Sequence, residues 1–183
     1  MTFQNDPQFS AQAVETRVQN LWMQLHLGRA KRDLEPLQPY FSPALYSREE
    51  AALAQDIREN RMRCAGRPAV LNSSLTLQGT AGGVEILECR LLTRYIPQTL
   101  AWDSRACLSN GSETFFREVW TLARPEGTKT IVPGKVVSVH CPGCGAALSL
   151  YKSAKCPMCG SLTKVPTFSW TVTDIVVRVE RNP

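Results

Sequence analysis

Apolar residues in the first third of the chain recur with the period of a helix. This spacing predicts a helix from about residue 7 to Gly28 or just beyond, with one apolar face formed by Val14, Val18, Leu21, Trp22 and Leu25. Asp6 lies directly before a proline, a pattern typical of a helix start. Asp33 is suited to cap a shorter second helix, and Ser47 to cap a third one over residues 48–62. The first third is therefore expected to be helical.

After residue 68 the apolar positions change to a period of two, which is typical of strands. We expect strands over residues 70–78, 84–96, 112–124 and 167–179, with a turn at 79–83. In the first strand, Leu71, Leu75 and Leu77 are expected to share one face. A change of phase at Ile86-Leu87 suggests a bulge in the second. The segment 112–124 also fits a helix, but its aromatic and β-branched content favours a strand.

This order of elements, helices first and antiparallel strands afterwards, indicates the α+β class. We therefore expect a curved antiparallel sheet with the helices packed on one face. A chain of 183 residues with 43% hydrophobic residues is large enough for one domain, or for one domain with a small accessory module.

The net charge and the search for targeting signals exclude few classes of function. The formal net charge is +5, and the Lys and Arg residues are scattered rather than gathered into dense basic runs. No run of eighteen apolar residues exists, and the N-terminus lacks the pattern of a secretory signal. We expect a soluble intracellular chain. An odd number of cysteines, seven, fits a reducing compartment, and three of them, Cys64, Cys89 and Cys107, are expected to be small buried residues.

The other four cysteines form two identical Cys-x-x-Cys pairs, eleven residues apart: Cys141, Cys144, Cys156 and Cys159. Each pair can present two thiolates to one Zn²⁺, which prefers four such ligands in a tetrahedron. Duplication of the pair, without a βαβ pattern around it, disfavours unrelated free thiols or a redox pair. A site with four cysteine ligands is closed, so we predict one structural Zn²⁺ per chain and no catalysis by it. His140 is expected to be a polar residue at the end of a strand rather than a ligand.

Two other stretches resemble a known family. Residues 21–46, with Arg-Asp-Leu, Pro-Tyr and Leu-Tyr in that order, resemble the opening of the mitochondrial inner membrane translocase subunit 44-like (Tim-44-like) domain. The stretch FFREVWTLAR at 115–124 is similar to that family's Phe-x-Glu-x-Trp-Thr strand. Some bacterial members insert a Cys-Pro-x-Cys-Gly-Ala ribbon before a last strand that contains Trp, as Cys141–Cys159 and then Trp170 are arranged here.

The resemblance covers roughly residues 14–178 and implies a cone-shaped nuclear-transport-factor-two-like fold. Residues 1–140 and 161–183 would form the cone, and residues 141–160 a zinc ribbon inserted between the last two strands. Relatives recruit partners at membranes rather than catalyse reactions. This chain differs in having no upstream membrane helix or obvious targeting segment, so whether it is a fragment of a membrane-anchored protein stays open. We expect it in the cytoplasm, with a place at the periphery of the inner membrane as the alternative.

Cone folds also include enzymes, which project a histidine with a carboxylate, or paired acids, into their pocket. His26 has no acid one helical turn away, and strand glutamates such as Glu113 and Glu118, like Asp103, are usually solvated. We therefore expect a binding module for a polypeptide partner or a membrane lipid or similar ligand. If the cone holds a pocket, its expected lining residues are Trp22, Tyr40, Tyr46 and Trp120. The alternatives are a cone-fold enzyme acting on a small substrate, and a nucleic-acid-binding ribbon that uses Lys152, Lys155 and Lys164.

Overall fold

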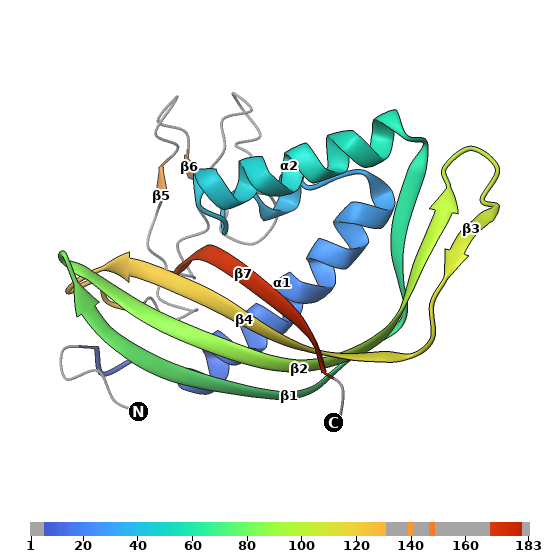
Figure 1. Cartoon of the computed structure of the whole chain (residues 1–183). Coiled ribbons are helices and arrows are strands. Elements are labelled where there is room, and N and C mark those ends of the chain that lie inside the picture. Colours follow the sequence, from blue (N-terminus) through green and yellow to red (C-terminus); the bar gives the residue numbers. More distant parts are fainter. Residues whose placement is uncertain (1–5, 131–138, 141–146, 149–168, 181–183) are drawn as a thin grey trace.

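Two helices lie on one face of a curved antiparallel sheet (Figure 1). The protein is described here by a computed structural model, in which the described residues are 6–130, 139–140, 147–148 and 169–180. The two-layer arrangement confirms the predicted α+β class and is consistent with a nuclear-transport-factor-two-like cone. The segment predicted as ambiguous, 112–124, is a strand, as its aromatic content suggested.

Helix α1 (Ala11–Lys31) carries the predicted apolar face, but it begins later than expected. Its N-cap is Ser10, whose hydroxyl accepts a hydrogen bond from the N–H of Ala13. The prediction of a start at Asp6 was wrong, because that carboxyl group is bonded to Arg124 of the sheet instead.

The second and third predicted helices are a 3₁₀ turn and a longer α-helix. Turn η1 (Glu35–Leu37) follows Asp33, whose side chain accepts a hydrogen bond from the N–H of Glu35. Helix α2 (Pro43–Arg58) begins earlier than Ser47, because Ser42 caps it and a proline occupies its first position. The last of the three prolines in residues 36–43 thus starts a helix rather than breaking one.

The main sheet has the strand order β1 (Arg61–Ala81), β2 (Val84–Ala101), β4 (Thr114–Pro125) and β7 (Thr171–Glu180), all antiparallel. A short strand, β3 (Cys107–Asn110), also pairs with β2, near the far end of the long hairpin. β7 pairs with β4, although residues 126–170 separate them in the sequence. As predicted, the last strand therefore returns to the sheet and becomes its edge.

The β1–β2 hairpin is longer and less regular than its sequence pattern predicted. β1 begins at Arg61, and its register with β2 shifts at three places, between Gly66 and Ala69, between Val70 and Asn72, and between Leu77 and Gly79. The third shift lies opposite Ile86-Leu87, so the predicted bulge exists, but the extra residue belongs to β1. Leu71 is the extra residue of the second shift and is 46% exposed, so it does not share a buried face with Leu75.

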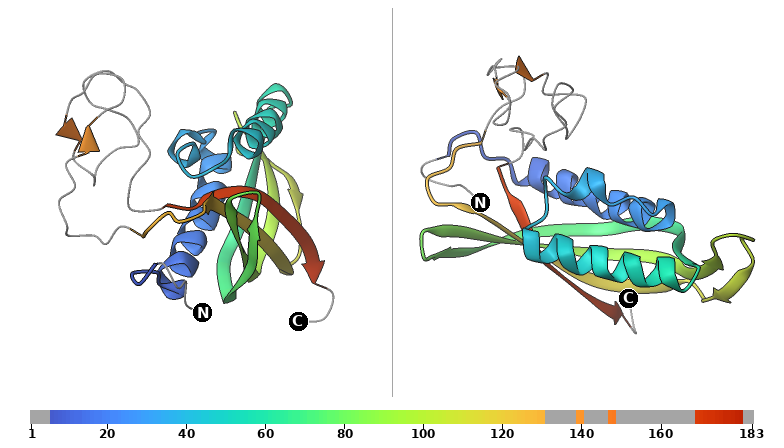
Figure 2. Two further views of the ribbon diagram at one scale, coloured as in Figure 1. Left: turned by 90° about the vertical axis from the view of Figure 1, so that its left-hand side faces the viewer. Right: turned by 90° about the horizontal axis from the view of Figure 1, so that it is seen from above.

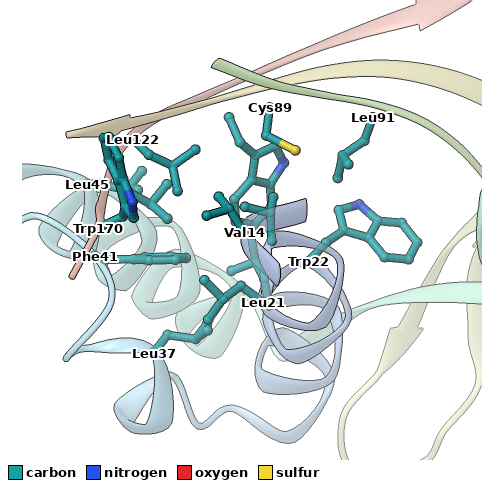
Figure 3. Packing of buried hydrophobic residues seen from close by; sticks show 14 of the residues in the cluster. Val14, Leu21, Trp22, Leu37, Phe41, Leu45, Cys89, Leu91, Leu122 and Trp170 are labelled. Atoms are coloured by element: carbon teal, nitrogen blue, oxygen red, sulfur yellow. The ribbon is translucent and has the colours of Figure 1, made fainter. Parts of the chain in front are cut away.

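The core lies between α1 and the inner face of the sheet, with Leu37, Phe41 and Leu45 closing one end (Figure 3). Residues from β2, β4 and β7 alternate into it: Leu87, Cys89, Leu91, Trp120, Leu122 and Val172. Trp170 and Val172 are buried, and Ile175 is partly buried. Val177, which follows on the same side of β7, is 49% exposed, and the end of β7 extends past α2 (Figure 2).

A second, two-stranded ladder pairs β5 (Val139–His140) with β6 (Ala147–Leu148). Cys141 and Cys144 fall between these strands in the sequence. All four predicted zinc ligands and the expected ribbon lie outside the described residues, except for the β6 backbone.

Candidate functional site

Glu118 of β4 is buried, with an exposed fraction of 4%. Trp22 of α1 donates its indole N–H to Oε1 at 2.7 Å, and the Thr93 hydroxyl donates to the same oxygen at 3.0 Å. The indole N–H of Trp120 donates to Oε2 at 3.1 Å. Three neutral donors thus satisfy the buried carboxyl group, which joins α1 to β2 and β4. Our expectation of a solvated Glu118 was wrong.

His26 and Tyr95 lie beside this carboxyl cluster. The His26 ring is 4.6 Å from the Trp22 ring and 4.9 Å from the Tyr95 ring, between centroids. Burial, with a smaller effect of the Arg29 charge, lowers the pKa of His26 to about 4. Burial also raises the pKa of Tyr95 to about 12, and the nearby Glu118 adds to this. At neutral pH, His26 is an uncharged imidazole held among aromatic rings.

Two of the residues weighed for acid–base chemistry, His26 and Glu118, therefore contact the same indole, that of Trp22. The other two candidates are exposed: Glu113 forms an ion pair with Arg94 at 3.6 Å, and Asp103 accepts a hydrogen bond from the N–H of Ser104. A carboxyl group already bonded by three donors is suited to positioning Trp22 and Trp120. This arrangement gives the enzyme hypothesis no specific support.

The four predicted pocket residues lie at different depths of one core. Trp22 and Trp120 are fully buried, whereas Tyr40 and Tyr46 are partly buried and pack against the core from outside. The Tyr40 carbonyl oxygen accepts a hydrogen bond from the N–H of Val172. Burial, and then the charge of Glu50, raises the pKa of Tyr46. That these four residues line a ligand pocket stays a prediction.

A second buried charge cluster surrounds Arg124, whose side chain is 0% exposed. Its guanidinium bonds to Asp6 at 2.7 Å, forms an ion pair with Glu85 of β2, and lies 4.4 Å from the centre of the Trp170 ring. Asp6 also accepts hydrogen bonds from the N–H and hydroxyl of Thr130. Burial alone would raise the pKa of Asp6, but these hydrogen bonds outweigh it and lower the pKa. The cluster joins four separate segments, which indicates a structural role.

The outer face of the sheet, away from the helices, carries a hollow of about 740 Å³ that spans β1, β2, β4 and β7. Leu92, Arg117 and Arg178 stand side by side in register across its floor. The neighbouring row consists of Arg90, Val119 and Val176. No sequence pattern predicted this hollow, because its residues come from four strands and are polar residues or isolated apolar ones.

Two of the three arginines that line this hollow form ion pairs with acidic residues. Arg90 forms an ion pair with Glu88 at 2.9 Å, and Arg117 forms one with Glu180. Arg117 and Arg178 nevertheless face each other directly in the register, and like charges at such positions destabilise a sheet. An anionic group placed between them would therefore be stabilised.

The cysteines that the structure describes are Cys64, Cys89 and Cys107. Cys89 is fully buried, and burial raises its pKa to about 12, as expected for an inert core thiol. Cys64 is partly buried and its pKa is also raised by burial, but Cys107 on β3 is exposed, so the expectation that it is buried was wrong. Among the described residues, no group of three or more His, Cys, Asp or Glu side chains is placed to hold a metal ion.

Comparison with known proteins supports the fold only. No protein-family model and no curated protein sequence matches this chain. The fold is similar to the crystal structure of the intermembrane space region of the chloroplast protein ARC6, with a TM-score of 0.51 and 11% sequence identity over 95% of this chain and 100% of that one. No helix within the described part of the chain has the length and apolar character needed to span a bilayer.

Proposed function

We propose that this protein is a non-enzymatic binding module for a polypeptide partner, and that the hollow on the outer face of the sheet is its binding site. The observation that carries the proposal is the in-register pair Arg117–Arg178 in a hollow that also exposes Val176. Cationic and apolar side chains side by side suit a polypeptide with acidic and apolar residues.

The same geometry favours a polypeptide over a lipid-like ligand. The space between the helices and the sheet is filled, in the described part of the chain, by side chains such as Trp22 and Trp120. An acyl chain would require an apolar cavity, whereas the hollow is lined by three arginines together with Asn72 and Ser74.

Other parts of the proposal rest on the sequence or on the fold alone. Membership in the Tim-44-like family and a place peripheral to the inner membrane rest on the resemblance, and the similarity to ARC6 supports only the fold that the resemblance implies. One structural Zn²⁺ on Cys141, Cys144, Cys156 and Cys159 rests on the spacing of the paired turns.

Titration of a fluorescent, reduced and carboxymethylated acidic polypeptide tests the proposal. The wild-type chain is expected to bind it. Val119→Glu places a carboxylate among the arginines of the hollow, where it competes with the acidic residues of the ligand. This variant is expected to weaken binding about tenfold, on the order of the loss of one charged contact. Leu108→Glu is the control, since Leu108 is 56% exposed on β3, away from the hollow. Equal binding by the two variants would contradict the proposed site.

Anionic liposomes and single-stranded nucleic acid are the competing ligands in the same assay. Binding to liposomes alone would favour the lipid alternative. Nucleic-acid binding that weakens steeply with salt, and is lost with the ribbon lysines, would favour the nucleic-acid alternative. Turnover of a small substrate that is abolished by Glu118→Gln would replace the binding proposal with an enzyme.

A further inference from the structure

We propose that the open end of the β7 edge, Val177–Val179, accepts an extended segment of the partner as an added strand, with an acidic side chain of that segment facing Arg178 between two apolar ones. This inference rests on the proposed function, and it names the mode of binding and the chemistry of the recognised segment.

β7 is an edge strand, and its first half is closed to further pairing. At Val172, the N–H donates to the Tyr40 carbonyl, and the carbonyl accepts from the N–H of Ser42. At Ile175, the carbonyl accepts from the Arg48 guanidinium at 3.2 Å, and the N–H donates to the Asp174 side chain at 2.9 Å. Arg48 and Asp174 also form an ion pair with each other at 2.8 Å. Exposed strand edges are commonly closed in this way.

The second half of the same edge is open. In an antiparallel strand the backbone groups of alternate residues point to the same edge, so those of Val177 and Val179 point the same way as those of Ile175. Within residues 6–130 and 169–180, no hydrogen bond closes these outward groups. Val177 is 49% and Val179 61% exposed, and the end of β7 extends past α2 (Figure 2, right). An added strand therefore has access.

The side chains of β7 specify what the added strand carries. Val177 and Val179 pair with Glu118 and Phe116 of β4 and so lie on the inner side, whereas Arg178 pairs with Arg117 on the outer side. Cross-strand neighbours on one face interact directly, and their side chains alternate between faces. An acidic residue of the partner would thus reach Arg178 in the outer hollow, while its two neighbours cover the exposed valines.

A second copy of this chain fits this edge less well. Antiparallel self-pairing that uses only the open stretch places Arg178 opposite Arg178 of the other copy, next to Arg117 of both. Such like-charge pairing is destabilising. An acidic segment instead relieves the repulsion that already exists between Arg117 and Arg178.

Two synthetic peptides test the inference with the full-length chain: acetyl-Thr-Val-Glu-Val-Thr-amide, and the same peptide with Lys in place of Glu. Amide NMR titration is suited to the weak binding of so short a segment. The Glu peptide is expected to shift the amide signals of Val177 and Val179 and to slow their hydrogen exchange. A preference of about fivefold over the Lys peptide is expected from one exposed ion pair.

Three variants separate backbone pairing from side-chain contact. Val179→Pro removes an outward N–H without removing a bond to β4, and proline is tolerated at such edge positions; it is expected to weaken binding on the order of tenfold. Val179→Thr, which keeps the N–H and the shape of the side chain, is the matched control and should retain most of the affinity. Arg178→Glu should reverse the preference toward the Lys peptide.

The outcomes separate this inference from the proposed function. Suppose that the carboxymethylated acidic polypeptide binds, that Val119→Glu weakens this binding, and that Val179→Pro has no effect on it. The inference of an added strand would then be wrong, while the outer hollow would remain the proposed binding site. Slow exchange of the Val177 and Val179 amides in the free monomer would show that the chain itself closes the edge, and would overturn the inference. So would a dimer, seen by sedimentation, that Val179→Pro dissociates.

Discussion

Glu118 shows, at the scale of single residues, how strand phase decides burial. A strand glutamate is usually solvated, and on that basis we expected Glu118 at the surface. Its burial is set instead by the alternation of side chains between the two faces of β4. Phe116, Trp120 and Leu122, which lie on the same face as Glu118, are buried too. Burial is tolerable because two indole N–H groups and a hydroxyl converge on the carboxyl.

Glu118→Gln is therefore expected to destabilise the protein by about 1–3 kcal/mol. The amide oxygen can still accept hydrogen bonds from Trp22 and Thr93, but its NH₂ group then faces the indole N–H of Trp120, and two donors oppose each other. Urea unfolding followed by tryptophan fluorescence measures the loss. Glu113→Gln, at an exposed residue just before β4, should change the free energy of unfolding by less than about 0.5 kcal/mol. Equal effects would show that the carboxyl is not held as described.

His26 predicts a pH dependence of stability. Its pKa in the folded protein is about 4, below the ordinary value of 6.5, so the unfolded chain takes up a proton at a higher pH than the folded chain does. The free energy of unfolding must then fall as the pH is lowered from about 6.5 toward 4. Between pH 7 and pH 5 the expected loss due to His26 is about 2 kcal/mol.

His26→Phe should remove that part of the pH dependence, because the new ring keeps aromatic contact with Trp22 and Tyr95 but does not titrate. Urea unfolding of both proteins at pH 7 and pH 5 gives the change in the free energy of unfolding between the two pH values for each protein. An identical change in both proteins would mean that His26 is charged, or exposed, in the folded state.

At the scale of elements, the type of the long segments was predictable, but their ends, the 3₁₀ turn η1 and the short strand β3 were not. The periodicity of residues 14–25 and the β-branched composition of the last strand predicted α1 and β7 correctly. The start of α2 depends on Ser42 and on the proline that follows it, whereas the pattern alone favoured Ser47. The shifts of β1 depend on its partner, since register is a property of two strands.

The candidate site was less predictable than the elements, for the same reason. The hollow and the open edge form only when residues from four strands stand in register, and the facing of Arg117 and Arg178 follows from a pairing across residues 126–170. Parity along β4 could have shown that Glu118 and Arg124 point inward. Sequence alone could not show which donors meet them.

Arg124 ties the N-terminal segment to the sheet, and its removal should be costly. Arg124→Met leaves Asp6 and Glu85 buried without their cation, which is expected to cost about 3–5 kcal/mol. Arg94→Met is the control, because the Arg94–Glu113 pair is partly exposed, with side chains 36% and 43% exposed, and should contribute at most about 1 kcal/mol. Thermal and urea unfolding of both variants compare the two. A loss no larger than that of the control would contradict the structural role of the cluster.

At the scale of the whole molecule, the pairing of β4 with β7 determines what an insertion between them can do. β7 supplies Val172 to the core, and the buried Trp170 precedes it; β7 pairs with β4 although residues 126–170 lie between the two strands in the sequence. A connection between two neighbouring antiparallel strands can vary in length without altering their register. The helices and the main sheet should therefore fold without the residues predicted to bind zinc.

Replacing residues 141–160 by a short Gly-rich turn is accordingly expected to leave a cooperatively unfolding protein that retains the outer hollow but no longer binds zinc. Metal analysis should give one Zn²⁺ per wild-type chain, and less for Cys141→Ser. Because structural zinc contributes on the order of 10 kcal/mol to the folding of small zinc-finger peptides, a chelator should unfold the ribbon while the helices and main sheet keep their melting transition.

Truncation after residue 140 removes β7 and the buried Trp170, so that chain should not fold. A truncated chain that melts like the wild type, together with a loop replacement that does not fold, would show that residues 141–160 support the sheet rather than extend from it.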